Sequence, residues 1–296
     1  MYPSWNARAV GLVLEAPKTV EIAAQAGFAG VDLLVRDLVE SAIDPHELRA
    51  RMDDLGLRGG AWPLPVDWRG PEARFAEDLR SLPRYARAAA VLGLFRTGTW
   101  VLPEVVPDLE VAGRETDPLV ERTTRFHLDR LGRIAAILAD HGSRLGLEIL
   151  GPASAHQGHA PPFVQRYQHL EERLGRLRQA HSNVGVLADA FHLFATGERN
   201  EAGLVWGANA VIWVHLADAA HADRASLRDQ ERALPGETGW GDCAGLLGLL
   251  KAQGYEGPVT AEPLAHCGSL RGMNALATAR QTMAALRSIW PGRPVA

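Results

Sequence analysis

The sequence predicts an α/β protein, a single (β/α)8 TIM barrel that comprises all 296 residues. Short, almost continuously apolar runs alternate with longer helical patterns, and this alternation is repeated eight times along the chain. Apolar runs of this kind are typical of parallel strands that are covered by helices. Eight units in series favour closure into a barrel, and no Pro- or Ser-rich linker divides the chain into two domains.

Four strand–helix units are expected in the first half of the chain. The predicted strands are 8–14, 30–35, 57–62 and 96–102. The helices that follow them are predicted at 18–26, from Asp44 and Pro45 onward, at about 71–92, and up to about His141. Asp44 suits the N-cap because its carboxylate accepts a backbone N–H, and Pro45 suits the first helical position. The loop at 103–118 is long enough to serve as a lid.

The second half repeats the same pattern. Its predicted strands are 144–150, 183–188, 210–216 and 258–262. The helices are predicted to end at about Ala180 and to cover roughly 200–208, 242–253 and 273–289. The repeat is one of architecture, because the eight units share no repeated sequence.

Charge and composition narrow the classes of function. The chain carries 31 Lys and Arg against 35 Asp and Glu, and its arginines stand beside acidic residues in predicted helices. A basic groove for nucleic acid is therefore not expected. No apolar run reaches about 18 residues, and no leader pattern opens the chain, so we expect a cytoplasmic protein without a membrane segment. Cys243 and Cys267 make neither a disulfide framework nor a CxxC metal site.

Four ionisable residues close the apolar strands of the second half, about one strand–helix unit apart. They are, in chain order, Glu148, Asp189, His215 and Glu262. In a (β/α)8 barrel the functional side chains come from the C-terminal ends of the strands and from the loops that follow. We therefore expect these four side chains to meet at one place and to bind one divalent metal ion.

The types of ligand indicate which metal ions suit this site. Three carboxylates and one imidazole favour Mn²⁺, with Mg²⁺, Co²⁺ or Fe²⁺ as alternatives, and Zn²⁺ is not excluded. A metal ion that chelates a carbonyl and a neighbouring hydroxyl polarises the carbonyl and acidifies the adjacent C–H bond. A carboxylate can then take the proton from one face, and a second carboxylate can return it.

Several motifs together resemble a known family. They are the segments 27–32 (GFAGVD), 189–192 (DAFH), 215–218 (HLAD), 234–242 (LPGETGWGD) and 254–262 (GYEGPVTAE). In this combination the chain resembles the xylose isomerase-like TIM barrels, in their sugar isomerase/epimerase branch. The resemblance extends over essentially the whole chain and is densest from Leu147 to Pro263.

The resemblance implies roles for individual residues. The four strand-end residues match the metal ligands of that branch one for one, and Glu148 and Glu262 match its two proton-transferring glutamates. His192 matches a histidine that contacts a substrate hydroxyl or supports the metal ligands. His221 departs from the branch, whose epimerases often carry an arginine for a substrate oxygen there. Arg224, in the same loop, is a candidate to replace it.

Two aromatic residues are further candidates for the substrate pocket. Trp62 and Trp100 end the third and fourth predicted strands, where an indole can stack on the C–H face of a sugar. Packing in the top layer of the barrel core is the other interpretation of both residues. A phosphate cradle at Gly236, Gly239 and Gly241 is disfavoured by acidic neighbours, which favours an unphosphorylated substrate.

These features predict a metal-dependent isomerase or epimerase that acts on a ketose, an inosose or a related polyhydroxy ketone. The alternative is a lyase that dehydrates a keto-inositol or dehydroshikimate, or cleaves a 3-keto-glycoside. Two other functions are disfavoured. A DNA-repair endonuclease on the same barrel would need more metal-binding histidines and a basic groove. A non-catalytic binding protein would not need all four metal ligands to be intact. The expected partner is a small polyol ketone, and the chain is expected to assemble as a homodimer or homotetramer.

Overall fold

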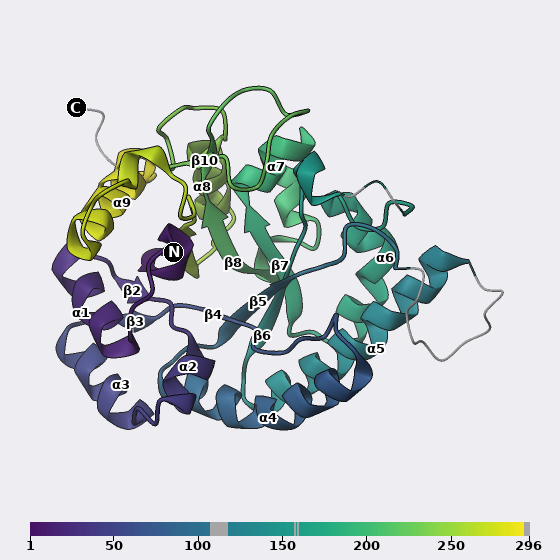
Figure 1. Cartoon of the computed structure of the whole chain (residues 1–296), viewed down its shortest axis with the longest axis horizontal. Helices are drawn as coiled ribbons and strands as arrows, with labels where there is room; N and C mark the ends of the chain where they lie inside the picture. The colour runs from purple at the N-terminus through teal and green to yellow at the C-terminus, as the bar shows by residue number, and fades with distance from the viewer. Residues whose placement is uncertain (107–117, 157, 159, 293–296) are drawn as a thin grey trace.

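The computed structural model describes residues 1–106, 118–156, 158 and 160–292. In this part of the chain nine parallel strands form one sheet that curls into a barrel, with helices around it (Figure 1). Across the sheet the order is β3 (Arg58–Gly59), β2 (Gly30–Val31), β1 (Tyr2–Trp5), β11 (Pro258–Ala261), β8 (Val211–Leu216), β7 (Val184–Asp189), β6 (Arg144–Glu148), β5 (Arg96–Trp100) and β4 (Trp62–Pro63).

The two edges of this sheet belong to one extended segment, so the barrel closes on itself. β3 pairs with β2 and β4 pairs with β5, although only Gly60 and Ala61 separate them. The backbone N–H of Ala61 donates to the carboxylate of Asp32 rather than to a neighbouring strand. β3 and β4 therefore share the position predicted for one strand at 57–62, and the predicted (β/α)8 barrel is confirmed.

Nine helices surround the strands within the described part of the chain. They are α1 (Ala16–Ala26), α2 (Val35–Glu40), α3 (Pro45–Asp54), α4 (Glu72–Val91), α5 (Leu119–Asp140), α6 (Tyr167–Ala180), α7 (Ala190–Thr196), α8 (Cys243–Ala252) and α9 (Ala275–Ile289). Asp44 caps α3 as predicted, since its side chain accepts from the backbone N–H of His46 at 2.8 Å. None of the described helices is long and apolar enough to cross a membrane.

The prediction of the first strand at 8–14 was wrong. The first strand is β1, and Arg8–Val10 form a short 3-10 helix above it. Gly11 ends this turn in the left-handed region, at a φ of 79°, and a Cβ there would collide with Ala265. Ala9 and Gly11 thus lie against the loop after β11, whereas Val13 is exposed, so this apolar run is not a strand.

The helix predicted at roughly 200–208 was also misplaced. α7 begins directly after β7, because the carboxylate of Asp189 accepts from the backbone N–H of Phe191 and caps the helix. Gly197 ends α7 with a φ of 69°, and Asn200–Leu204 form a 3-10 helix. Most of the predicted lid loop at 103–118 lies outside the described residues, because the description stops at 106 and resumes at 118.

The interior of the barrel is filled below the strand ends. A Cβ on Gly98 would lie 2.7 Å from Leu187 Cδ1 and 3.2 Å from the ring of Trp213. A Cβ on Gly146 would meet Leu187 at 3.3 Å. These glycines on β5 and β6 leave room for the large side chains of β7 and β8, so the polar strand ends stand on a packed apolar floor.

Candidate metal centre

The four predicted metal ligands come together at the C-terminal ends of four adjacent strands. Glu148 and Asp189 end β6 and β7, His215 lies in β8 beside Asp189, and Glu262 follows β11. One potential ligand atom from each residue lies within 4.8 Å of those of the other three. Such a cluster can surround one small cation, which agrees with the arrangement expected from the sequence.

Buried polar atoms without partners support a metal ion at this position. Glu148 Oε1 and both ring nitrogens of His215 are buried and have no hydrogen-bond partner. His215 Nδ1 lies 3.1 Å from Glu262 Oε2 and 3.4 Å from Glu148 Oε1, without hydrogen-bond geometry. Because an unsatisfied buried polar atom costs about 1–3 kcal/mol, atoms left in this state call for a ligand. The donor set fits a divalent cation.

Arg232, which the sequence analysis missed, projects into the same cluster. It lies in the short strand β10 (Arg232–Ala233), which pairs with β9 (Asp218–Ala219) outside the barrel sheet. Its Nη1 donates to Asp189 Oδ2 at 2.9 Å and to Glu262 Oε2 at 3.1 Å. Its Nη2 donates to Asp229 Oδ1 at 2.7 Å. The only signal in the sequence was its place directly before the LPG stretch.

The charged groups of the cluster shift one another's pKa values. Burial raises the pKa of Glu148. Burial opposes ionisation of Glu262 as well, but His215 and Arg232 outweigh it and lower its pKa to about 2. Burial by itself would lower the pKa of His215, yet the carboxylates of Glu262 and Glu148 raise it well above its usual value. In the metal-free protein a protonated imidazole thus balances the carboxylates, and metal binding would displace that proton.

His192 lies beside the ligands, as expected, and is almost completely buried. Its Nδ1 accepts from the backbone N–H of Gly151 at 3.2 Å, and its Nε2 lies 3.4 Å from Arg232 Nη2. Nε2 is 3.6 Å from Asp189 Oδ2 and 3.9 Å from Glu148 Oε1. This position allows His192 to orient two of the ligand carboxylates.

The other predicted substrate contacts lie in different environments. Trp62 is fully buried, and its indole donates to the carbonyl of Leu94, so this residue is part of the core. Trp100 is half-buried at the end of β5 and pairs in register with Glu148. His221 has an exposed side-chain fraction of 39% and contacts Glu231, and Arg224 stacks on Phe194 at 4.6 Å. The structure brings Trp100 alone of these four beside a metal ligand.

The glycine-rich segment at 234–242 is held by Asp218. Both the backbone N–H of Thr238 and that of Gly239 donate to Asp218 Oδ2, at 2.9 and 2.8 Å. These amides are consequently occupied within the protein. This arrangement is consistent with the prediction that the glycine-rich segment does not bind phosphate.

A buried hydrogen-bond chain supports the metal ligands from below. Asp32 Oδ1 accepts from Ser4 Oγ and Asp32 Oδ2 from Thr260 Oγ1, each at 2.6 Å. Thr260 Oγ1 in turn accepts from the indole N–H of Trp213 at 2.9 Å. The ring of Trp213 packs edge-on against His215, with 4.4 Å between the centroids. This chain fixes the imidazole from its inner side.

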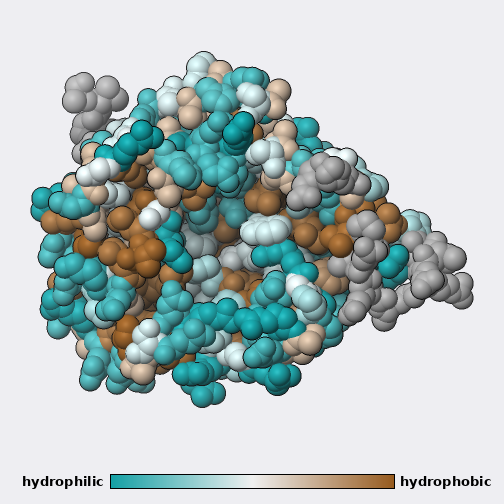
Figure 2. All heavy atoms as spheres, in the orientation of Figure 1, coloured by the Kyte–Doolittle hydropathy of each residue, from teal (hydrophilic) through white to brown (hydrophobic). Residues whose placement is uncertain are grey.

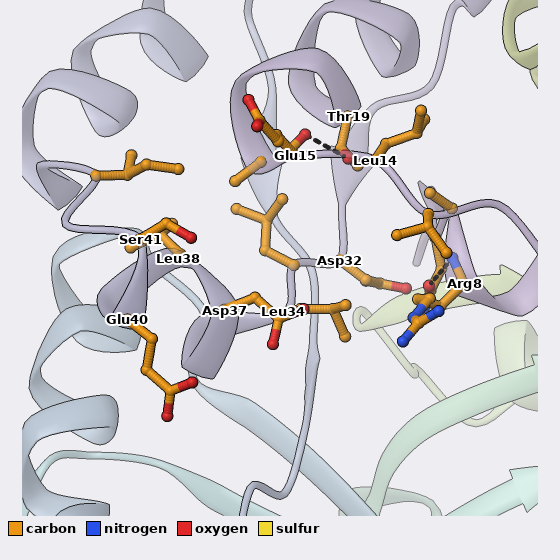
Figure 3. Close-up of a pocket in the computed structure, with 16 residues that line it drawn as sticks. Arg8, Leu14, Glu15, Thr19, Asp32, Leu34, Asp37, Leu38, Glu40 and Ser41 are labelled. Atoms are coloured by element: carbon orange, nitrogen blue, oxygen red, sulfur yellow. Dashed lines mark hydrogen bonds between the residues drawn. The ribbon is translucent and has the colours of Figure 1, made fainter.

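A cavity of about 400 Å³ lies among the residues that follow β1 and β2. Asp32 and Arg8 lie near each other at one end of it, and Glu40 lies at the other end (Figure 3). None of the four metal ligands lines this cavity. On the face drawn in Figure 2, hydrophilic residues surround a hollow near the centre.

Known enzymes and structures resemble this chain. It is 27% identical over 250 residues to a 3-dehydroshikimate dehydratase of Pseudomonas putida, a match that covers 83% of this chain and 35% of that protein. The chain therefore spans about a third of the length of this relative. A xylose isomerase domain protein from Alicyclobacillus acidocaldarius is 26% identical, with a TM-score of 0.77 and 97% of each chain covered.

The fold is also shared with the IolI protein, whose structure was solved with a bound zinc atom. That protein is 17% identical, with a TM-score of 0.76, and the likeness covers 98% of each chain. The family model described as xylose isomerase-like TIM barrel matches residues 20–289. With its closed barrel and its strand-end ligands, the chain belongs to the xylose isomerase-like TIM-barrel family.

Proposed function

We propose that this protein is a metal-dependent enzyme that removes a proton next to the carbonyl group of a polyhydroxy ketone. The observation that carries the proposal is the cluster of Glu148, Asp189, His215 and Glu262, in which Glu148 Oε1 and both ring nitrogens of His215 are buried without a hydrogen-bond partner. A divalent ion held there would polarise a substrate carbonyl and acidify the adjacent C–H bond. Mn²⁺ is the expected ion, and the zinc-bound relative makes Zn²⁺ the first alternative.

The two glutamates would divide the proton transfer between them. Glu148 is the better proton acceptor, because burial raises its pKa and strengthens its basicity. Glu262 is kept ionised by His215 and Arg232, and it follows β11, which β7 and β8 separate from the strand of Glu148. His192 lies beside Glu148, with its Nε2 3.9 Å from Glu148 Oε1, and would contribute to the electrostatic environment of that carboxylate. Asp189 would serve as a ligand only, because Arg232 and the N-terminus of α7 occupy its carboxylate.

Two reactions can follow the first proton transfer. In an isomerase or epimerase, a proton returns to carbon, and the presence of two glutamates on strands separated by β7 and β8 favours this outcome. In a dehydratase, the electrons of the broken C–H bond form a C=C bond, the C–O bond of a β-hydroxyl breaks, and water leaves with the proton. The dehydratase from Pseudomonas putida favours this second candidate.

One NMR experiment separates the two reactions. The Mn²⁺-loaded protein is incubated in D₂O with D-fructose and, separately, with 3-dehydroshikimate. Deuterium that enters beside the carbonyl of an otherwise intact ketone indicates an isomerase or epimerase. Appearance of the aromatic product 3,4-dihydroxybenzoate indicates a dehydratase. If neither exchange nor water loss occurs with these ketones or with inososes, the proposal is wrong.

Two variants test the assigned proton transfers. Glu148→Gln and Glu262→Gln are each expected to abolish turnover, since an amide cannot accept the proton. Glu47→Gln, an exposed carboxylate on α3 in the outer ring of helices, is the matched control and should leave the rate unchanged. Full activity in both cluster variants would contradict the assigned roles.

A further inference from the structure

Arg69 lies at the rim of the barrel beside the metal centre, and the proposed proton transfer does not use it. It belongs to the loop after β4, and its Nη1 donates to the carbonyl of Trp100 at 2.8 Å and to Thr99 Oγ1 at 3.1 Å. Its guanidinium stacks on the indole of Trp100, with Cζ 3.6 Å from the ring centroid. Trp68 lies on another side, at 4.9 Å. These contacts hold the cation in one place.

The position of Trp100 connects Arg69 with the metal ligands. Trp100 and Glu148 are register partners in the neighbouring strands β5 and β6. Gly98 and Gly146, two residues earlier in each strand, face the packed interior. Because side chains alternate along a strand, Trp100 and Glu148 project to the same side, on strands about 4.8 Å apart. The guanidinium that stacks on Trp100 therefore belongs to the same end of the barrel as the metal site, with one indole ring from the neighbouring strand beside it.

Arg69 has no acidic partner among the residues that the structure describes. No carboxylate there lies within 4.0 Å of its guanidinium, and its Nε and Nη2 groups form no hydrogen bond. Burial accordingly lowers the pKa of Arg69 to about 10. Arg232, in β10, instead contacts the carboxylates of Asp189, Glu262 and Asp229. The charge of Asp67 opposes this shift but forms no ion pair with Arg69. A partly buried cation without an ion-pair partner is costly unless a ligand supplies the anion.

We propose that Arg69 binds a carboxylate of the substrate, so that the enzyme acts on a polyhydroxylated keto acid and not on a neutral ketose. A guanidinium presents parallel N–H groups that match the two oxygens of a carboxylate. Its stacking on Trp100 leaves the edge that carries Nε and Nη2 available for this contact. This assignment of the substrate class rests on the proposed function, which places the carbonyl at the metal centre.

A binding experiment without turnover tests this inference. The probes are 3,4-dihydroxybenzoate and its uncharged analogue 3,4-dihydroxybenzamide, whose two hydroxyls can approach the metal in the same way. Their dissociation constants for the Mn²⁺-loaded protein are measured by isothermal titration calorimetry. We expect the wild type to bind the benzoate about tenfold or more tightly, as a charge-assisted bidentate contact would give. Arg69→Gln should lose this preference and keep its affinity for the benzamide.

Matched variants separate a specific contact from a general loss of charge. Arg58→Gln removes an arginine that also stacks on an aromatic ring, that of Tyr2, but at the other end of the barrel. This control should retain the full preference for the benzoate. Arg69→Lys keeps the charge without the fork and should keep only part of the preference. If Arg69→Gln does not fold, the benzoate preference of Arg69→Lys is compared with that of the wild type instead.

Each outcome bears directly on the assignment. The inference is overturned if the wild type shows no preference, including the case in which neither probe binds, or if Arg69→Gln retains it. Tighter binding of D-fructose 6-phosphate than of the benzoate, lost in Arg69→Gln, would show a phosphate site instead. The proposed function is tested separately, by deuterium exchange into D-fructose with Arg69→Gln. Exchange catalysed by this variant would support the proposed proton transfer even if the inferred preference for an acid fails.

Discussion

Asp32→Asn is expected to remove a pH dependence of stability that this buried carboxyl creates. Burial raises the pKa of Asp32 from 3.8 to about 6, although Ser4, Thr260 and the backbone N–H of Ala61 donate to it. The folded protein therefore holds this proton more tightly than the unfolded chain does. Its contribution to stability is complete below about pH 4 and is lost as the pH rises through about 6.

The magnitude follows from the size of the shift. A difference of about two pKa units corresponds to roughly 3 kcal/mol, since each unit is worth about 1.4 kcal/mol. About 2 kcal/mol of this should be lost between about pH 4.5 and pH 7, where most of the proton release occurs. Asparagine carries no titratable proton and can still accept from Ser4 and Ala61. Relative to the variant, the wild type should thus lose about 2 kcal/mol across this interval.

Urea denaturation of both metal-free proteins, at several pH values in that interval, measures the difference in free energy of unfolding. The metal-ligand carboxylates titrate in both proteins, so their effects cancel in the comparison. Asp37→Asn, an exposed residue beside the same cavity, controls for the loss of one surface carboxylate. A difference between wild type and Asp32→Asn that stays constant with pH would refute this account of Asp32.

Three further predictions concern the metal centre and the barrel. Saturating Mn²⁺ or Zn²⁺ should stabilise the wild type, by about 4 kcal/mol at a thousand times the Kd, and Asp189→Ala should abolish this rise in Tm. Arg232→Met should destabilise the metal-free protein by about 3–5 kcal/mol, because it leaves buried carboxylates unpaired, and metal should restore more stability than it adds to the wild type. An equal metal-induced gain in stability in the wild type and in Arg232→Met would contradict this prediction. Gly185→Ala should destabilise by about 1–3 kcal/mol or more, because its Cβ would lie 1.9 Å from a backbone carbonyl oxygen. Gly248→Ala in α8, whose Cβ meets nothing within 4 Å, should instead stabilise by about 0.5–1 kcal/mol in the same denaturation assay.

The ligand set was accessible from the sequence because it depends on periodicity alone. Each of Glu148, Asp189, His215 and Glu262 closes an apolar run, and parallel strands of a closed barrel present their C-terminal ends at one rim. Once eight strand–helix units are recognised, the convergence of these side chains follows without knowledge of any loop. The prediction of the first strand was wrong because the apolar run 8–14 forms a short helical turn against a loop and then an exposed segment that includes Val13, and neither has the period of a strand.

The tertiary structure alone decided which cations accompany the ligands. Arg232 comes from the two-residue strand β10 and Arg69 from the loop after β4, and the course of both segments depends on contacts with distant residues and not on a repeating pattern. Arg232 reaches Asp189 and Glu262 because β10 pairs with β9 outside the barrel sheet. Arg69 stays unpaired because it stacks on Trp100, a contact across 31 positions of the chain. The sequence therefore determined where a metal ion would be held, and the folded loops determined the charges around it.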